Sequence, residues 1–228
     1  MWGSELNPAN VLPEYPRPQL VREEWKNLNG LWDYRIQPRF SELPDSFSQK
    51  ILVPFAIESS LSGVGRTVGK ENVLIYRTKF DLPKSWKGKR ILLHFGGADW
   101  ETELYVNKIK AGSHRGGYDE FSFDISDQLV KNGKQEIIVS VWDPSNDGYQ
   151  PRGKQVKKPG GIWYTSVTGI WQTVWLEPVN TSFIESARNT PLIDKNLLSV
   201  DANIKGWQSG DVLVVKSYDG AREIAKVE

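Results

Sequence analysis

Short stretches of this chain alternate hydrophobic with polar residues, a pattern typical of β-strands. Phe121, Phe123 and Ile125 alternate with Ser122 and Asp124, which places one set of side chains on a buried sheet face. Strands are predicted at residues 31–36, 51–53, 73–80, 90–95, 103–106, 121–125, 137–142, 171–176, 182–186, 197–204, 211–218 and 223–227.

No segment keeps a 3.6-residue hydrophobic period over an ordinary helix length. Residues 19–28 are the best candidate for a short helix, since they stop at Asn29-Gly30, a plausible helix end. Regularly spaced short strands without intervening helices favour an antiparallel sandwich or barrel over a parallel α/β sheet. The predicted fold class is therefore all-β, a β-sandwich.

Aromatic residues become sparse after Pro178, although predicted strands continue to the end. We expect one domain at 1–178 and a second β domain at 179–228. An immunoglobulin-type sandwich needs about seven strands and roughly 100 residues, so the second stretch is too short to close one. The chain is expected to be a fragment.

Composition narrows the classes of partner. The 228 residues are 39% hydrophobic and 25% charged, with a formal net charge of +1, so no strong positive field exists to grip nucleic acid or an anionic membrane. No apolar run reaches a membrane span, and the first residues do not resemble a signal peptide. The sequence does not specify the cellular compartment: the protein is periplasmic or secreted if a signal peptide was removed, and otherwise cytoplasmic.

No cofactor or metal site is expected. The chain has no cysteine and two histidines, and His94 and His114 fall in different predicted elements without ligand spacing. His94 is expected to pack within a strand. His114 is placed on a turn, where it could contact a ligand or another domain.

Ten Trp, eight Tyr and eight Phe are unusually many. One long loop, residues 142–155, mixes Trp142 and Tyr149 with Asp, Asn and Arg, the combination with which proteins hold sugars. The alternative is that both rings pack the rim of the sandwich, and composition alone favours it.

Nine short motifs resemble, in order, signatures of the N-terminal sugar-binding domain of family 2 glycoside hydrolases, which include β-galactosidases, β-glucuronidases and β-mannosidases. The motifs are LNGLW (28–32), VPFAIES (53–59), YRTKF (76–80), HFGGADW (94–100), YVN (105–107), GSHRGGY (112–118), FSFDI (121–125), GIWYT (161–165) and GIWQTVWLE (169–177). One departure is Asn107-Lys108, where the family usually has Asn-Gly; Asn tolerates the left-handed conformation, so only the turn type is in question.

The resemblance implies a jelly-roll sandwich for residues 1–178 and the start of an immunoglobulin-like domain at 179–228, which in the family precedes a (β/α)8 catalytic barrel. Retaining glycosidases need two carboxyl groups about 5 to 5.5 Å apart, and in the family both are glutamates on the barrel. The acid/base glutamate there follows an asparagine, and this chain has no Asn-Glu pair. No catalytic residue is expected here; the pair is expected beyond Glu228.

Two residues could still touch substrate. In β-galactosidases that resemble this chain, the first domain contributes an asparagine before the Tyr-containing strand and an aspartate in the long Asp-Gly loop. These match Asn72 and Asp147, the former only with a one-residue shift. The alternative is turn chemistry, because Asn and Asp favour such loops anyway.

Three classes of function follow. The first is the noncatalytic N-terminal part of a retaining exo-β-glycosidase, with a β-galactoside or β-glucuronide-like carbohydrate as substrate and the absent barrel as partner. The second is a free-standing carbohydrate-binding module, and the third is a structural interaction domain.

Overall fold

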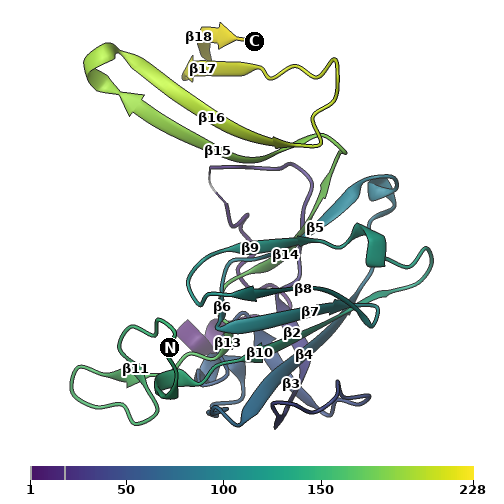
Figure 1. Cartoon of the computed structure of the whole chain (residues 1–228), viewed down its shortest axis with the longest axis vertical. Coiled ribbons are helices and arrows are strands. Elements are labelled where there is room, and N and C mark those ends of the chain that lie inside the picture. Colours follow the sequence, from purple (N-terminus) through teal and green to yellow (C-terminus); the bar gives the residue numbers. More distant parts are fainter. Residues whose placement is uncertain (1, 18) are drawn as a thin grey trace. The chain divides into compact units, whose positions relative to one another are not determined.

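The computed structural model describes residues 2–17 and 19–228, and no α-helix occurs in these ranges. The chain divides into two compact units (Figure 1). The first comprises Arg22–Pro178 with the N-terminal residues to Pro16, and the second comprises Val179–Glu228 with Arg17–Val21. The all-β prediction is confirmed, and the first unit is a jelly-roll sandwich.

The larger sheet of the first unit has six strands, all paired antiparallel. In spatial order they are β3 (Gln49–Val53), β2 (Gly30–Pro38), β4 (Asn72–Phe80), β10 (Gln135–Trp142), β7 (Glu101–Val106) and β8 (Ile109–Arg115). Because β4 and β10 pair at the centre, segments far apart in sequence form the middle of the sheet.

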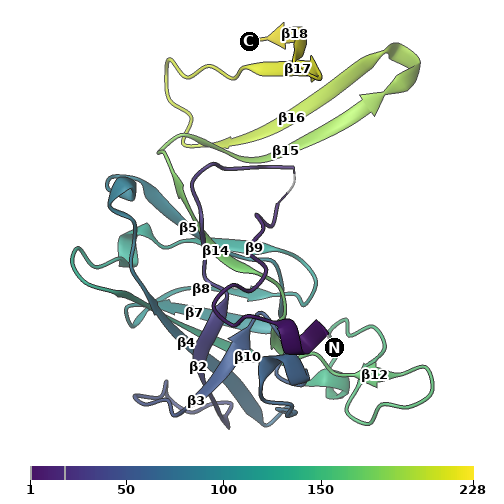
Figure 2. The same ribbon diagram turned by 180° about the vertical axis from the view of Figure 1, so that it is seen from behind.

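The second sheet has four strands (Figure 2). They are β1 (Lys26–Asn27), β14 (Val174–Val179), β5 (Arg90–Phe95) and β9 (Phe121–Asp124). Two small pairs lie outside the sheets: β6 (Ala98–Asp99) with β13 (Gly169–Ile170), and β11 (Gln155–Val156) with β12 (Tyr164–Thr165).

The main core fills the space between the two sheets. Trp32 and Tyr76 from the larger sheet meet edge to face at 6.3 Å, and Phe95 of the smaller sheet is fully buried in the same cluster. A second apolar cluster, including Ile75, lies on the other face of the larger sheet, where Phe47 packs against it. The segment between β2 and β3 thus covers part of that face.

Six 3₁₀ turns complete the described elements: η1 (Trp2–Glu5), η2 (Ser60–Ser62), η3 (Lys84–Trp86), η4 (Ser126–Gln128), η5 (Ser145–Asp147) and η6 (Ile193–Lys195). The helix predicted at 19–28 is wrong. Its last residues form β1 instead, and Lys26 pairs with Leu176, because backbone hydrogen bonds to a sheet edge outweigh weak local helix propensity.

Further differences concern strands. The strand predicted at 171–176 begins only at Val174, the strand predicted at 211–218 begins only at Val215, and β8 was not predicted. β8 follows a hairpin in which Asn107 and Lys108 both have positive φ, 49° and 71°, as a type I′ turn requires. His114 therefore lies in a strand and not on a turn.

The second unit consists of two antiparallel hairpins, β15 (Phe183–Leu192) with β16 (Leu197–Lys205), and β17 (Val215–Asp219) with β18 (Arg222–Val227). None of the residues in these strands is buried. Large apolar side chains such as Trp207, Val212 and Tyr218 are more than half exposed. That this unit begins an immunoglobulin-like domain stays a prediction.

The second unit is expected to be the first part cut in limited proteolysis. Two-stranded hairpins without a buried face are marginally stable in water, so they open more often than the sandwich. Trypsin digestion followed by mass spectrometry should place the first cleavages within 179–228. Early cleavage inside 20–178 with an intact C-terminal segment would contradict this expectation.

Candidate functional site

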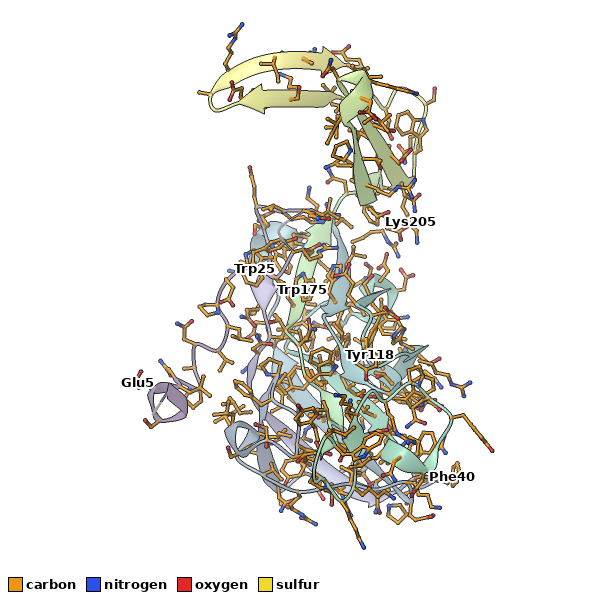
Figure 3. The ribbon with its side chains drawn as sticks, turned by 90° about the vertical axis from the view of Figure 1, so that its left-hand side faces the viewer. Glu5, Trp25, Phe40, Tyr118, Trp175 and Lys205 are labelled. Atoms are coloured by element: carbon orange, nitrogen blue, oxygen red, sulfur yellow. The ribbon has the colours of Figure 1, made fainter. Side chains whose placement is uncertain are left out.

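A pocket of about 610 Å³ opens at one end of the sandwich. Three turns form its wall: the one after β2, the one before β4 and the one after β10. Figure 3 shows Phe40, from the first turn, at the opposite end of the sandwich from Trp175. The lining residues are Pro38, Arg39, Phe40, Ser41, Lys70, Glu71, Trp142, Pro144 and Asp147.

The aromatic wall of the pocket is held rigidly. The Arg39 guanidinium lies 3.3 Å from the centre of the Trp142 ring, a cation–π contact, and its Nη2 is 3.4 Å from Glu101. The Trp142 indole N–H donates to the carbonyl of Lys70 at 2.7 Å. The Phe40 ring is 91% exposed, so it presents a free apolar surface.

Asp147 lies in this wall, at the end of η5. Its carboxylate forms an ion pair with Lys157. This hydrogen bond from Lys157 lowers the pKa of Asp147, and the charge of Lys70 lowers it further. Asp147 is therefore an ionised acceptor that keeps a partly exposed face toward the pocket.

Asn72 is the first residue of β4 and is not among the lining residues. Its side-chain amide donates to the carbonyl of Val68 at 3.1 Å, an interaction that closes the turn before the strand. The preceding residues Lys70 and Glu71 do line the pocket. Asn72 thus directly follows two pocket-lining residues in the sequence, but its amide is directed into the turn.

A cluster of buried carboxylates lies at the same end of the sandwich, and sequence analysis did not single it out. Asp143 follows β10 and is 2% exposed. It accepts hydrogen bonds from the Ser145 N–H at 2.7 Å, from the Gln150 amide at 3.2 Å and from the Thr168 hydroxyl at 3.1 Å. Burial raises its pKa.

Glu58 and Asp99 complete this cluster. Glu58 accepts from the backbone N–H of Thr168 at 2.9 Å, so Thr168 joins Glu58 to Asp143. Asp99, 3% exposed, accepts from Gln155 at 3.3 Å. Burial, with the charges of Asp143 and Glu58, raises the pKa of Asp99 to about 7. Burial likewise raises the pKa of Glu58.

The other candidate residues take structural positions. His94 is 5% exposed and stacks on Trp175 with ring centres 4.8 Å apart, as expected for a packed strand histidine. His114 stacks on Phe121 at 4.0 Å, and burial lowers its pKa. Tyr149 is fully exposed and does not pack the rim.

Within residues 2–17 and 19–228, no group of three or more His, Asp and Glu side chains is arranged to hold a metal ion. Nor does any helix in these residues have the length and apolar character needed to cross a bilayer.

Curated relatives are glycosidases. A β-galactosidase from Thermoanaerobacter pseudethanolicus is 33% identical over 112 residues, which cover 48% of this chain and 14% of that protein. A β-glucuronidase from Bacteroides fragilis is 31% identical over 123 residues, which cover 54% of this chain and 16% of that protein. The chain thus matches less than a fifth of either relative.

Solved structures share the fold. A β-glucuronidase from Ruminococcus gnavus in complex with a C6-substituted uronic isofagomine matches 92% of this chain and 39% of its own chain, with a TM-score of 0.69 and 19% identity. A β-glucuronidase from Faecalibacterium prausnitzii matches 94% of this chain and 40% of its own chain, with a TM-score of 0.65 and 19% identity. At such identity the likeness concerns the fold alone.

The family assignment rests on the first unit. The model of the glycosyl hydrolases family 2 sugar binding domain matches residues 25–177, which is most of the sandwich and all of its central strands. This chain therefore belongs to glycosyl hydrolase family 2 and contains its sugar-binding domain.

Proposed function

We propose that this chain is the noncatalytic N-terminal part of a retaining exo-β-glycosidase of the β-galactosidase or β-glucuronidase kind. The complete enzyme would hydrolyse O-glycosyl bonds in carbohydrate metabolism, with its paired glutamates on a barrel beyond Glu228. The family match over 25–177 carries this proposal. It is supported by the named relatives, of which the chain matches only 14% and 16%.

Asp147 is the residue through which the sandwich would reach the sugar. It lies on an exposed turn, its carboxylate is ionised, and it shares a pocket with the aromatic residues Phe40 and Trp142. A carboxylate can accept hydrogen bonds from sugar hydroxyls, and these are stronger than bonds between neutral groups. Asn72 would be a second contact only if its amide left the Val68 carbonyl.

Replacing Asp147 with alanine in the complete enzyme is expected to lower kcat/KM about tenfold or more on the best substrate, since a charge-assisted bond to the sugar would be lost. The measurement is steady-state kinetics with purified enzyme. Asp127→Ala is the matched control, because Asp127 is an exposed aspartate in η4 with a side chain 80% exposed.

The control should leave kcat/KM unchanged. If Asp147→Ala stays within twofold of wild type, Asp147 is a turn residue whose role is to pair with Lys157. If both variants lose activity equally, the loss reflects the loop or the fold and not a sugar contact.

A free-standing carbohydrate-binding module is the second candidate, favoured by the pocket itself. Its volume of about 610 Å³ lies within the range of small-molecule sites, and the exposed Phe40 ring offers a stacking face for a pyranose. Titration of this 228-residue chain with galactose, glucuronate and mannose, followed by NMR, separates the two candidates. Saturable binding without the barrel would favour the module.

A further inference from the structure

Three buried carboxylates hold together the loops at one end of the sandwich. Glu58 comes from the turn after β3, Asp99 from β6, and Asp143 from the end of β10. Through the Ser145 N–H, the Gln155 amide and Thr168 they also hold the start, the middle and the end of the long 144–167 segment, on which Asp147 lies. The backbone N–H of Val167 adds a 2.6 Å hydrogen bond to the Gln155 side chain.

No ion pair within residues 2–17 and 19–228 neutralises these carboxylates. Among the described residues, no Lys, Arg or His nitrogen lies within 4 Å of Glu58, Asp99 or Asp143. The charge of Asp143 acts on both Glu58 and Asp99, and the charge of Glu58 acts on Asp99. Tyr76 approaches Glu58 from β4, and Tyr118 reaches Gln155 at 3.5 Å from the loop after β8.

Space around Asp99 is tight as well. A Cβ on Gly117 would lie 2.6 Å from the Asp99 carboxylate, so the loop after β8 presses directly against it. Buried like charges without a counterion repel strongly in a low-dielectric site. Three ionised carboxylates in this position would push the loops apart.

We propose that this end of the sandwich is a pH-sensitive clamp, in which a carboxyl proton held among Glu58, Asp99 and Asp143 keeps the 144–167 segment closed. Loss of that proton as the pH rises through neutrality loosens the segment and leaves the two sheets intact. The device concerns this chain alone and stands whether or not the pocket binds sugar.

The direction of the pH effect follows from linkage. The pKa of Asp99 is about 7 in the closed state, whereas an open loop would return it toward the ordinary value of about 3.9. The closed state therefore binds more protons, so its stability is greatest at acidic pH and falls as pH rises to about 7. Above that range both states are ionised and the dependence levels off.

Amide hydrogen exchange of the wild-type chain tests the clamp without any substitution. The N–H groups of Ser145, Val167 and Thr168 each donate to a side chain of the cluster or of Gln155. Their protection factors, corrected for intrinsic exchange, should fall about tenfold between pH 6 and pH 8.5. The amides of Ile75 and Val139, central in the larger sheet, serve as the internal reference and should change little.

Asp99→Asn supplies the second test, because it removes the titrating group and keeps an oxygen for Gln155. This variant should lose the tenfold pH dependence and be better protected than wild type at pH 8.5. Asp45→Asn, at an exposed aspartate, is the control and should behave as wild type. Protection that stays constant with pH in the wild type, or that falls equally in Asp99→Asn, overturns the proposal.

Discussion

Replacing Glu177 with glutamine is expected to lower the free energy of unfolding by about 3 to 5 kcal/mol. The Glu177 side chain is completely buried and lies 2.8 Å from the Arg22 guanidinium. Tyr15 donates to it at 2.5 Å and Trp175 at 2.9 Å, and His94 lies 3.2 Å away. Replacing the carboxylate with a neutral amide removes the charge that pairs with the largely buried Arg22 guanidinium.

The effect should be large because Glu177 joins three segments. Tyr15 and Arg22 precede the first strand, His94 belongs to β5, and Trp175 shares β14 with Glu177. The N-terminal segment is thereby fixed to the smaller sheet. Chemical denaturation of wild type and variant, followed by Trp fluorescence, measures the difference.

Glu103→Gln is the matched control. Glu103 also pairs with a cation, Lys110 at 2.5 Å, but the two side chains are 38% and 50% exposed. Exposed pairs contribute about 0 to 1 kcal/mol, so this variant should unfold almost as wild type does. If Glu103→Gln and Glu177→Gln lower the free energy of unfolding equally, burial of the Glu177 carboxylate does not account for the effect.

The pH dependence gives an independent check. Burial alone would raise the pKa of Glu177, but hydrogen bonds from His94, Tyr15 and Trp175 and the charge of His94 outweigh it and lower the pKa well below its usual range. The stabilisation is thus complete above the unfolded-state pKa of about 4.3 and is lost as pH falls below it. The difference in the free energy of unfolding between wild type and Glu177→Gln should become smaller as the pH falls from 5 toward 2.

The 228-residue chain by itself is expected to hydrolyse no aryl β-glycoside. The carboxylates of Glu58, Asp99 and Asp143 neighbour one another, but they are occupied by hydrogen bonds from Ser145, Thr168 and Gln155. Asp99 and Asp143 are also closed to solvent. A glycosidase needs one carboxyl group on each side of an accessible glycosidic bond.

Chromogenic galactosides, glucuronides and mannosides provide the assay. Turnover should not exceed the buffer blank at high protein concentration. Activity that survives repurification and disappears in Asp143→Asn would refute the expectation and identify this cluster as catalytic. Activity that persists in Asp143→Asn would point to a contaminating enzyme.

Most strands could be predicted from local pattern, either by alternation or by a short apolar run. Trp32 and Tyr34 mark the buried face of the alternating strand β2, whereas β5, predicted at its observed bounds, is buried at five consecutive positions. β8 could not be found this way, since its residues are half-buried or exposed and show no clean alternation. The 19–28 segment failed for another reason: its conformation is set by β14, about 150 residues later in the chain.

The candidate site was only partly accessible to sequence reasoning. The loop after β10 carries an Asp-Gly pair, and the resemblance to β-galactosidases pointed to Asp147 in that pair. Asp143 stands four residues earlier in the same loop, yet nothing local distinguishes it from a solvated aspartate. Asp143 is bonded to Thr168, which lies 25 residues later in the sequence. Such a tertiary contact leaves no periodic signal in the sequence.

The strand order also constrains how the protein emerges from the ribosome. β4 lies between β2 and β10, so at about 5 to 20 residues per second it waits several seconds for the segment that completes its pairing. During that interval Ile75 and its neighbours form an unpaired apolar edge, which can pair with the edge of another chain. Closure of the smaller sheet comes last, when Leu176 reaches Lys26, so the sandwich is finished only as its own final strand is synthesised.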